Sequence, residues 1–292
     1  MSELARRWSV AAIGIPIVVG LLYVGEWFLA VPVAALAALG AREGYHLAEA
    51  RGVEPLSGLG AATAAALVLL AGWRSDWSGF AAGAVALIGA LALVALLVAT
   101  FGRGPARHPL AVVGITVFGA LYAGLALSFV PLLRGLPGRE GWMGDGSAAW
   151  AGVLVVALPL AATWVGDAAA YFAGGAWGRK KLAPTISPNK SWVGVWAGVL
   201  GAAVATALWF VVAAPLLPGL PLPGPLAAAA LGALLGVGAI VGDLAESVLK
   251  REAGAKDSGT LFPGHGGVLD RIDALIFTLP AAYAALVLAA GP

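Results

Sequence analysis

The sequence contains no cysteine and little charge, and each shortage excludes a class of function. Without cysteine in its 292 residues, the chain forms no disulfide, no thiolate metal site and no cysteine nucleophile. Charged residues make up 11% of the chain, against about 25% in soluble domains. The formal net charge is only +2, so the sequence carries no general signal for binding nucleic acid.

Apolar residues dominate instead, at 61% of the chain. A soluble fold of this size has too little interior to bury them, so we expect lipid to be the solvent for most of the protein. The 42 glycines agree with this expectation, because small residues let membrane helices approach closely. The first residues are basic and turn apolar at Val10, which we interpret as the first membrane span rather than a cleaved signal peptide.

Hydropathy predicts an all-α, polytopic integral membrane protein with about nine transmembrane helices. A helix needs about 20 apolar residues to cross the hydrocarbon core, and it satisfies its own backbone hydrogen bonds there. The predicted spans cover residues 8–24, 27–48, 58–73, 78–101, 109–133, 149–176, 191–215, 226–250 and 271–290.

The distribution of lysine and arginine predicts how the chain is oriented. With nine spans, all but three of the seventeen basic residues fall on one side, and Arg74, Arg134 and Arg139 fall on the other. Loops rich in lysine and arginine stay in the cytoplasm. We therefore expect a multi-pass protein of the cell (inner) membrane, with its N-terminus in the cytoplasm and its C-terminus outside.

The densest group of charges lies in the C-terminal part of the chain, on two predicted helix ends. Asp243, Glu246 and Lys250 recur at helical spacing, so one helix face carries two acids and a base. Asp270 and Asp273 share a face at the start of the last predicted helix. Hard divalent ions such as Mg²⁺ take carboxylate oxygens and share their remaining positions with phosphates and water. Acids from two helix ends can hold one or two such ions.

The loop between these helix ends supplies groups suited to phosphate. Gly266 and Gly267 let backbone N–H groups approach a phosphate closely. The loop also contains Lys256, Asp257 and His265, which we take as candidates for catalysis. Cations that can neutralise phosphate oxygens in a transition state are Lys250, Arg251, Lys256 and Arg271.

These residues also have simpler interpretations. His265 can be a capping or packing residue, and a mixed-charge loop between spans can be merely solvated. An Asp-x-x-Asp pair alone is weak support for a metal. The density of charge in a chain that is otherwise almost uncharged favours a site for an anionic substrate.

A second polar segment precedes this one. Asp167 lies inside a predicted span, where a carboxylate is costly, so it is a candidate functional residue. The structural alternative is a buried partner for a basic residue on another helix. The following loop offers Ser187, Asn189 and Lys190, whose short polar groups suit phosphate oxygens. The basic residues 179–181 can equally be topology anchors at the lipid headgroups.

Four closely spaced motifs complete the sequence analysis: Ser247-x-x-Lys250-Arg251, Lys256-Asp257-x-Gly259, Pro263-x-His265-Gly266-Gly267 and Asp270-Arg271-x-Asp273. Together they resemble the signature of the phosphatidate cytidylyltransferases, also called CDP-diacylglycerol synthases. Residues 186–192, preceded by Gly166-Asp167, are similar to a second stretch typical of that family. Residues 106–292 would then be the membrane helices that carry the catalytic loops. Residues 1–105 would be the variable N-terminal helices of the same membrane unit.

The resemblance implies a transferase of phospholipid biosynthesis that joins CTP to phosphatidic acid, forming CDP-diacylglycerol and pyrophosphate. It implies an all-helical membrane protein, a homodimer and Mg²⁺ as cofactor, with room for a second cation. Asp243, Asp270 and Asp273 match acids expected to bind the metal. The positions that match expected phosphate-binding groups are Lys250, Arg251, Lys256, Arg271 and residues 187–190.

Two other classes of function stay open at this point. One is another membrane enzyme that handles nucleotides or lipid phosphates, such as a polyprenol kinase or a CDP-alcohol phosphotransferase. The motif Asp-Gly-x-x-Ala-Arg of the latter is missing. The other is an ion-coupled transporter, which Asp167 inside a span would suit. A transporter has no need of a glycine-rich loop dense in aspartate and lysine.

Overall fold

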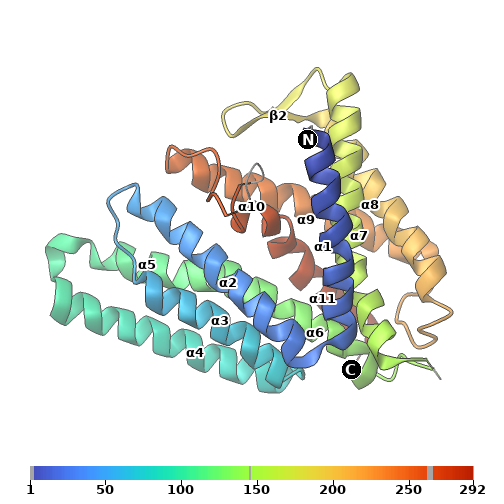
Figure 1. The fold of residues 1–292 in the computed structure, drawn as a ribbon, viewed down its shortest axis with the longest axis horizontal. Coiled ribbons are helices and arrows are strands. Elements are labelled where there is room, and N and C mark those ends of the chain that lie inside the picture. The colour runs from blue at the N-terminus through green and yellow to red at the C-terminus, as the bar shows by residue number, and fades with distance from the viewer. Residues whose placement is uncertain (1–2, 145, 262–265, 292) are drawn as a thin grey trace.

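The computed structural model of the chain describes residues 3–144, 146–261 and 266–291, with side chains from Gly14 onward except that of Arg103. The described chain is almost entirely helical (Figure 1). In chain order its elements are α1 (Glu3–Val24), α2 (Glu26–Glu49), α3 (Ser57–Trp73), α4 (Trp77–Val98), η1 (Ala99–Arg103), η2 (Pro105–Arg107), α5 (Pro109–Gly119), η3 (Ala120–Leu125), α6 (Ala126–Arg139), α7 (Ala148–Trp177), β1 (Lys181–Ala183), β2 (Ser187–Ser191), α8 (Trp192–Ala213), α9 (Pro225–Glu252), α10 (Leu269–Ile272) and α11 (Leu275–Ala290).

Each predicted span coincides with a helix or with a continuous run of helical elements. Seven of these helical segments in the described chain are long and apolar enough to cross a membrane. The helix Ser57–Trp73 is apolar but shorter, and of α1 the apolar part Gly14–Val24 is described with its side chains. The all-α, multi-pass class is therefore confirmed, whereas nine spans and the orientation stay predictions.

The segment between α7 and α8 differs from the sequence-based expectation. We expected a loop there, but β1 and β2 pair as an antiparallel hairpin in which Lys181 lies opposite Ser191. Ser191 then caps α8, because its hydroxyl accepts the N–H of Gly194 at 3.2 Å. The residues of this hairpin show no alternation of polar and apolar side chains, which is why periodicity did not indicate strands.

Small residues let neighbouring helices pack closely, and α8 and α9 give the plainest example. The hydroxyl of Thr206 donates to the carbonyl of Ala228 across the interface at 2.8 Å. Gly232 lies against the same threonine, and a Cβ there would lie 2.5 Å from the carbonyl oxygen of Ala202. The glycine is therefore required by close approach of two helix backbones.

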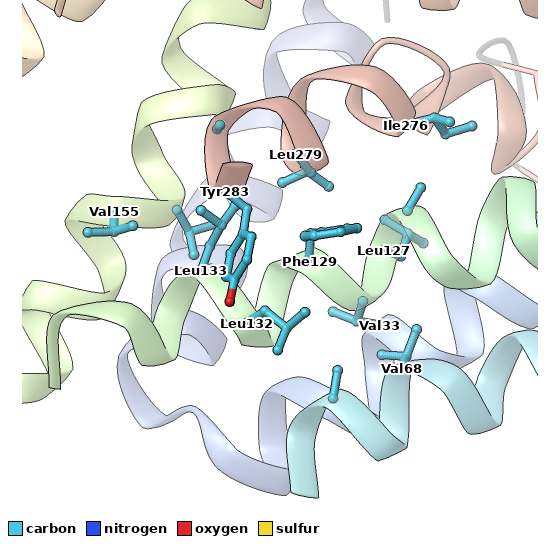
Figure 2. Close-up of a cluster of buried hydrophobic side chains, with 14 of the residues drawn as sticks. Val33, Val68, Leu127, Phe129, Leu132, Leu133, Val155, Ile276, Leu279 and Tyr283 are labelled. Atoms are coloured by element: carbon cyan, nitrogen blue, oxygen red, sulfur yellow. The ribbon is translucent and has the colours of Figure 1, made fainter. Parts of the chain in front are cut away.

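The apolar core joins helices from both sides of residue 105 (Figure 2). Val33 of α2, Phe129 of α6 and Leu279 of α11 belong to one buried cluster. The ring of Tyr283 packs edge-on against Phe129, with centroids 5.3 Å apart, a geometry that aromatic pairs favour. This cluster fixes α2 and α11 relative to each other.

The first and last described helices start and end at opposite ends of the molecule. The start of α1 lies at the same end of the molecule as the β1–β2 hairpin, and the end of α11 lies at the opposite end (Figure 1). At the start of α4, the carboxylate of Asp76 accepts the N–H of Gly79 at 2.6 Å and caps the helix. This hydrogen bond, with one from the Ser78 hydroxyl, holds the pKa of Asp76 below its usual value.

The close approach of α8 and α9 can be tested by adding one carbon atom. We expect Gly232→Ala to destabilise the protein by about 1–3 kcal/mol, because the new Cβ overpacks a backbone contact. Gly89→Ala on α4 is the matched control, since nothing lies within 4 Å of its Cβ position. Both changes raise helix propensity equally. Thermal unfolding in detergent should show a lower Tm for the first variant; equal Tm values would contradict the packing described.

Candidate active site

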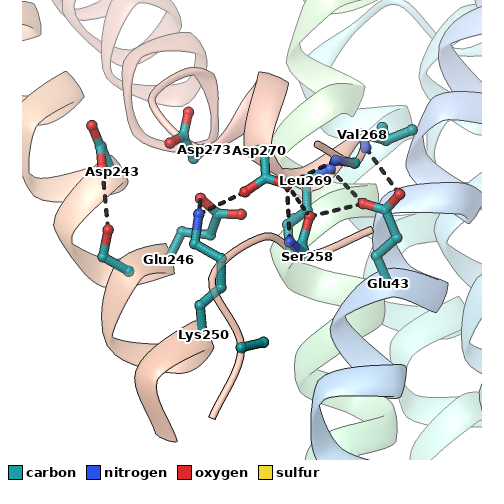
Figure 3. A network of polar contacts seen from close by, with 12 residues as sticks. Glu43, Asp243, Glu246, Lys250, Ser258, Val268, Leu269, Asp270 and Asp273 are labelled. Carbon is teal, nitrogen blue, oxygen red and sulfur yellow. Dashed lines mark hydrogen bonds and ion pairs between the residues drawn. The ribbon is translucent and has the colours of Figure 1, made fainter. Parts of the chain in front are cut away.

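The predicted site residues meet at the ends of three helices (Figure 3). The end of α9 carries Glu246 and Lys250, and the short α10 carries Asp270. Glu43 reaches the same place from α2, which is more than 200 positions away in the sequence. The geometry therefore combines both parts of the chain.

Lys250 lies between two carboxylates. Its ammonium is 2.8 Å from Oε2 of Glu246 and 2.6 Å from Oδ1 of Asp270. The three side chains are almost fully buried, with exposed fractions of 11%, 0% and 8%. Attraction between opposite charges is strong where water is excluded, and each buried charge here depends on its partner. The sequence had placed Lys250 among the phosphate-binding groups; in this structure it also neutralises two acids.

The second oxygen of Asp270 holds the glycine-rich loop. Oδ2 accepts the backbone N–H of Ser258 at 2.9 Å, the hydroxyl of Ser258 at 2.8 Å and the N–H of Gly267 at 2.8 Å. Gly266 has a φ of +77°, a backbone angle that residues other than glycine rarely adopt. A Cβ there would also lie 2.5 Å from Asp270. Asp270 thus positions the loop as much as it serves as a candidate ligand.

Glu43 is the residue that our sequence analysis missed. Its carboxylate accepts the N–H groups of Val268 at 3.0 Å and Leu269 at 2.8 Å. It also lies 3.1 Å from the hydroxyl of Ser258. The sequence did contain a signal for Glu43: it is an acid inside a predicted span. A carboxylate there is costly, which makes it a candidate functional residue. We applied that reasoning to Asp167 and not to Glu43.

The β1–β2 hairpin forms a second wall of the site. The ammonium of Lys190 pairs with Oδ2 of Asp243 on α9 at 2.7 Å. Arg251, the residue that follows Lys250 on α9, donates to the carbonyl of Ile186 in the hairpin turn at 3.2 Å. The charges of Lys190 and Asp243 also act on Asp167, which is exposed on α7. The structure therefore brings Asp167, Lys190 and Asp243 together from three separate segments.

The remaining predicted residues are more peripheral. Lys256, Asp257 and Arg271 are exposed around the loop, as is Asn189 in the hairpin, whereas Ser187 is half-buried. Gly267, in the loop itself, is buried. The prediction for His265 falls outside the residues that the structure describes. The exposed side chains among these residues can be reached by a soluble anion from the polar side of the site.

The acids of the site suit a hard cation in kind, although they form no closed set of ligands. In the described part of the chain, no three acidic or histidine side chains stand close enough to hold a metal ion. Oε1 of Glu246 is nevertheless buried and has no hydrogen-bond partner among the described residues. The charges of Asp273 and Asp270 act on Glu246, and that of Asp243 acts on Asp273. A buried, unpartnered carboxylate oxygen amid other acids is a position that a divalent cation would satisfy.

An apolar cavity of about 270 Å³ lies beside this polar network. Its lining residues come from α2 and the turn after it, from the helical run Pro109–Arg139 and from the end of α9, together with Leu269, which precedes Asp270. Tyr122 lines the cavity from the π-helical turn η3, and its hydroxyl is buried without a hydrogen-bond partner among the described residues. π-Helical turns within α-helices frequently occur at functional sites. A polar site and an apolar cavity side by side fit an amphipathic ligand.

The chain is similar in sequence to several known proteins. A profile of the cytidylyltransferase family matches residues 5–289 of the chain. A phosphatidate cytidylyltransferase of Synechocystis sp. is 33% identical over 97% of this chain and 96% of its own length. A chloroplastic phosphatidate cytidylyltransferase of Arabidopsis thaliana is 33% identical over 90% of this chain and 67% of its own length. A phosphatidate cytidylyltransferase of Pseudomonas aeruginosa is 47% identical over 121 residues, which is 41% of this chain and 42% of the relative.

The buried position of Lys250 yields a prediction on stability. Lys250→Met removes the ammonium between Glu246 and Asp270 and leaves two buried acids facing each other. We expect a loss of about 3 kcal/mol in the free energy of unfolding, the amount typical for breaking a buried ion pair. Lys256→Met is the control for stability, because the side chain of Lys256 is exposed. If both variants unfold in detergent at the same temperature as the wild type, Lys250 is not an essential counter-ion.

Proposed function

This chain belongs to the cytidylyltransferase family, and from that premise we propose that it is a phosphatidate cytidylyltransferase, which joins CTP to phosphatidic acid. One observation carries the proposal: the chain aligns over almost its whole length with a phosphatidate cytidylyltransferase of nearly the same extent. The products are CDP-diacylglycerol and pyrophosphate. The enzyme is a multi-pass membrane protein, as a reaction on a membrane lipid requires.

The reaction asks for positioning more than for acid or base catalysis. A phosphate oxygen of phosphatidic acid forms a bond to the α-phosphorus of CTP, and the bond from that phosphorus to the β-phosphate oxygen breaks. The attacking phosphate is already an anion, so no strong general base is needed. The main obstacle is repulsion between two polyanions, which cations in a site with little water can overcome.

The cations around the site are suited to this task. Lys190 and Arg251 connect the hairpin to α9, where they line the polar side of the site. Arg271 and Lys256 are exposed beside the loop and can approach a nucleotide from the aqueous side. We assign these side chains to the phosphates of CTP and Lys250 to the reacting phosphates. Ser187, Asn189 and the N–H groups of the glycine-rich loop would complete the phosphate contacts.

Mg²⁺ is the cofactor that we propose. Asp243, Asp270 and Asp273 remain the predicted ligands, and the unpartnered oxygen of Glu246 adds a fourth carboxylate to this set. A bound Mg²⁺ would offset the charge of the phosphates and of the departing pyrophosphate. Among the described residues, Lys250 alone contacts Oδ1 of Asp270, so this oxygen retains a lone pair for such an ion. A second cation and the homodimer stay predictions.

The lipid substrate requires an apolar region next to the phosphate groups. The cavity of about 270 Å³ beside Asp270 supplies one, and we propose that it receives part of an acyl chain. The active site would then face the cytoplasm from the inner membrane, where CTP is available. This orientation rests on the distribution of basic residues.

The alternatives are less well supported. A polyprenol kinase or an ion-coupled transporter would use a charged site inside a membrane protein too. Family membership and the names of the relatives favour the cytidylyltransferase.

The proposed activity can be measured directly. Purified protein in detergent, supplied with labelled CTP, phosphatidic acid and Mg²⁺, should release one pyrophosphate for each CDP-lipid formed. Replacing phosphatidic acid with diacylglycerol is the matched control, because diacylglycerol lacks the attacking phosphate. Folded protein that forms no CDP-lipid, or that phosphorylates diacylglycerol, would contradict the proposal.

The proposed metal ligands can be tested by removing charge without removing volume. Asp270→Asn and Asp273→Asn should each reduce turnover by about a hundredfold or more while leaving membrane insertion intact. Asp76→Asn is the control of the same chemical type, because asparagine also caps helices well. Lys181→Ala should matter much less than either aspartate. Near-normal turnover in both aspartate variants would remove these residues as ligands.

A further inference from the structure

The contacts of Glu43 point to a role that reaches the reacting groups from the N-terminal part of the chain. We propose that Glu43 is a positioning residue, which holds the glycine-rich loop so that Asp270 and Lys250 lie correctly for the reaction. This inference rests on the proposed cytidylyl transfer for its kinetic part. It concerns a residue outside all four motifs of the sequence analysis.

The first observation is the set of hydrogen bonds. Oε1 of Glu43 accepts the N–H of Val268 at 3.0 Å, and Oε2 accepts that of Leu269 at 2.8 Å. Val268 precedes α10 and Leu269 is its first residue, so no carbonyl of the same helix can accept their N–H groups. The α2 carboxylate therefore fixes the start of the segment that carries Asp270.

The second observation is the space around the carboxylate. A Cβ at Gly259 or at Gly267 would collide with the carboxylate group of Glu43. Gly259 lies on the early side of the loop, and Gly267 lies on its late side. Glu43 thus occupies a position between the two sides of the loop, and both sides approach it closely. A loop rich in glycine loses much conformational entropy when it is ordered, so an external anchor is of particular value here.

The third observation is a shared hydroxyl. The Oγ atom of Ser258 lies 2.8 Å from Oδ2 of Asp270 and 3.1 Å from Oε2 of Glu43. A serine hydroxyl has a single proton, so it donates to one carboxylate at a time. Each carboxylate already accepts two backbone N–H groups, so the shorter distance alone favours donation to Asp270. Glu43 and Asp270 therefore hold neighbouring backbone groups of the same loop, with Ser258 between them, and Asp270 in turn contacts Lys250.

The variant Glu43→Gln tests this role with the least change in volume. Whichever way the new amide is turned, its NH₂ group faces the N–H of Val268 or that of Leu269, so one hydrogen bond is lost. Misplacement of reacting groups by about 1 Å can lower a rate about a hundredfold. We therefore expect kcat, per folded molecule, to fall about a hundredfold. The KM for CTP should change less than kcat, because Lys190 on the hairpin and Arg251 on α9 keep their positions. Lys256 and the N–H groups of the loop account for any rise in this KM.

Two further variants separate positioning from a general loss of stability. Glu43→Asp keeps the charge on a shorter side chain and should recover part of the lost kcat. Glu49→Gln makes the same change on the same helix, at an exposed acid that contacts His46 and Ser57 instead of the loop. We expect it to match the wild type. Should Glu43→Gln fail to fold, Ser258→Ala replaces it, since it removes the hydroxyl between Asp270 and Glu43.

Hydrogen exchange supplies a readout that needs no substrate. In detergent, amides of residues 255–261 and 266–270 should exchange at least about tenfold faster in Glu43→Gln than in Glu49→Gln. Unchanged exchange there, or a kcat within twofold of the wild type per folded molecule, would overturn the proposal. A wild type that makes no CDP-lipid would refute the proposed function, and the exchange measurement would still decide whether Glu43 holds the loop.

Discussion

The arrangement of the site depends on how a lysine between two buried carboxylates is held in place. Lys250 neutralises Glu246 and Asp270, and this pairing allows the end of α9 and the start of the last helical segment to meet without a repulsive contact. Asp270 then uses its other oxygen to order the loop through Ser258 and Gly267. The same acid is a predicted metal ligand, so the structural and chemical demands on it coincide. The centre of the site keeps an excess of negative charge that suits a divalent cation, while several cations at its rim suit an anionic substrate.

Much of the fold could be predicted from the sequence, because hydrophobicity alone decides where membrane helices lie. The predicted spans agree with the observed helices in position, and the charged segment 242–273 does contain the end of α9 and the start of α10. The hairpin could not be predicted, because its strands are short and their residues do not alternate between polar and apolar side chains. The number of spans could not be predicted from composition either, because α3 is apolar but shorter than a helix that crosses the hydrocarbon core.

The site was predicted in part for a related reason. Motifs identified residues that are close in sequence, so the set from Lys250 to Asp273 emerged readily. Contacts between residues that are far apart in the sequence leave no comparable motif. Lys190 and Asp243 were named in separate segments and not as an ion pair. Glu43 was not named as a site residue, because it lies in an apolar part of the chain, far from the motifs. Helix periodicity placed Asp270 and Asp273 on one face, but it could not indicate that Asp270 turns towards Lys250 and the loop.

The contact between α2 and the start of α10 also bears on how the protein is made. Glu43 and Leu269 are separated by 226 positions, and such distant contacts form late because a long chain must first be closed on itself. During synthesis α2 enters the membrane long before its partner exists. The carboxylate of Glu43 therefore has no loop to contact until nearly the whole protein has been translated. The loop can then be ordered only at the last stage of assembly, so an incomplete chain inserted in the membrane would not yet hold a formed catalytic centre.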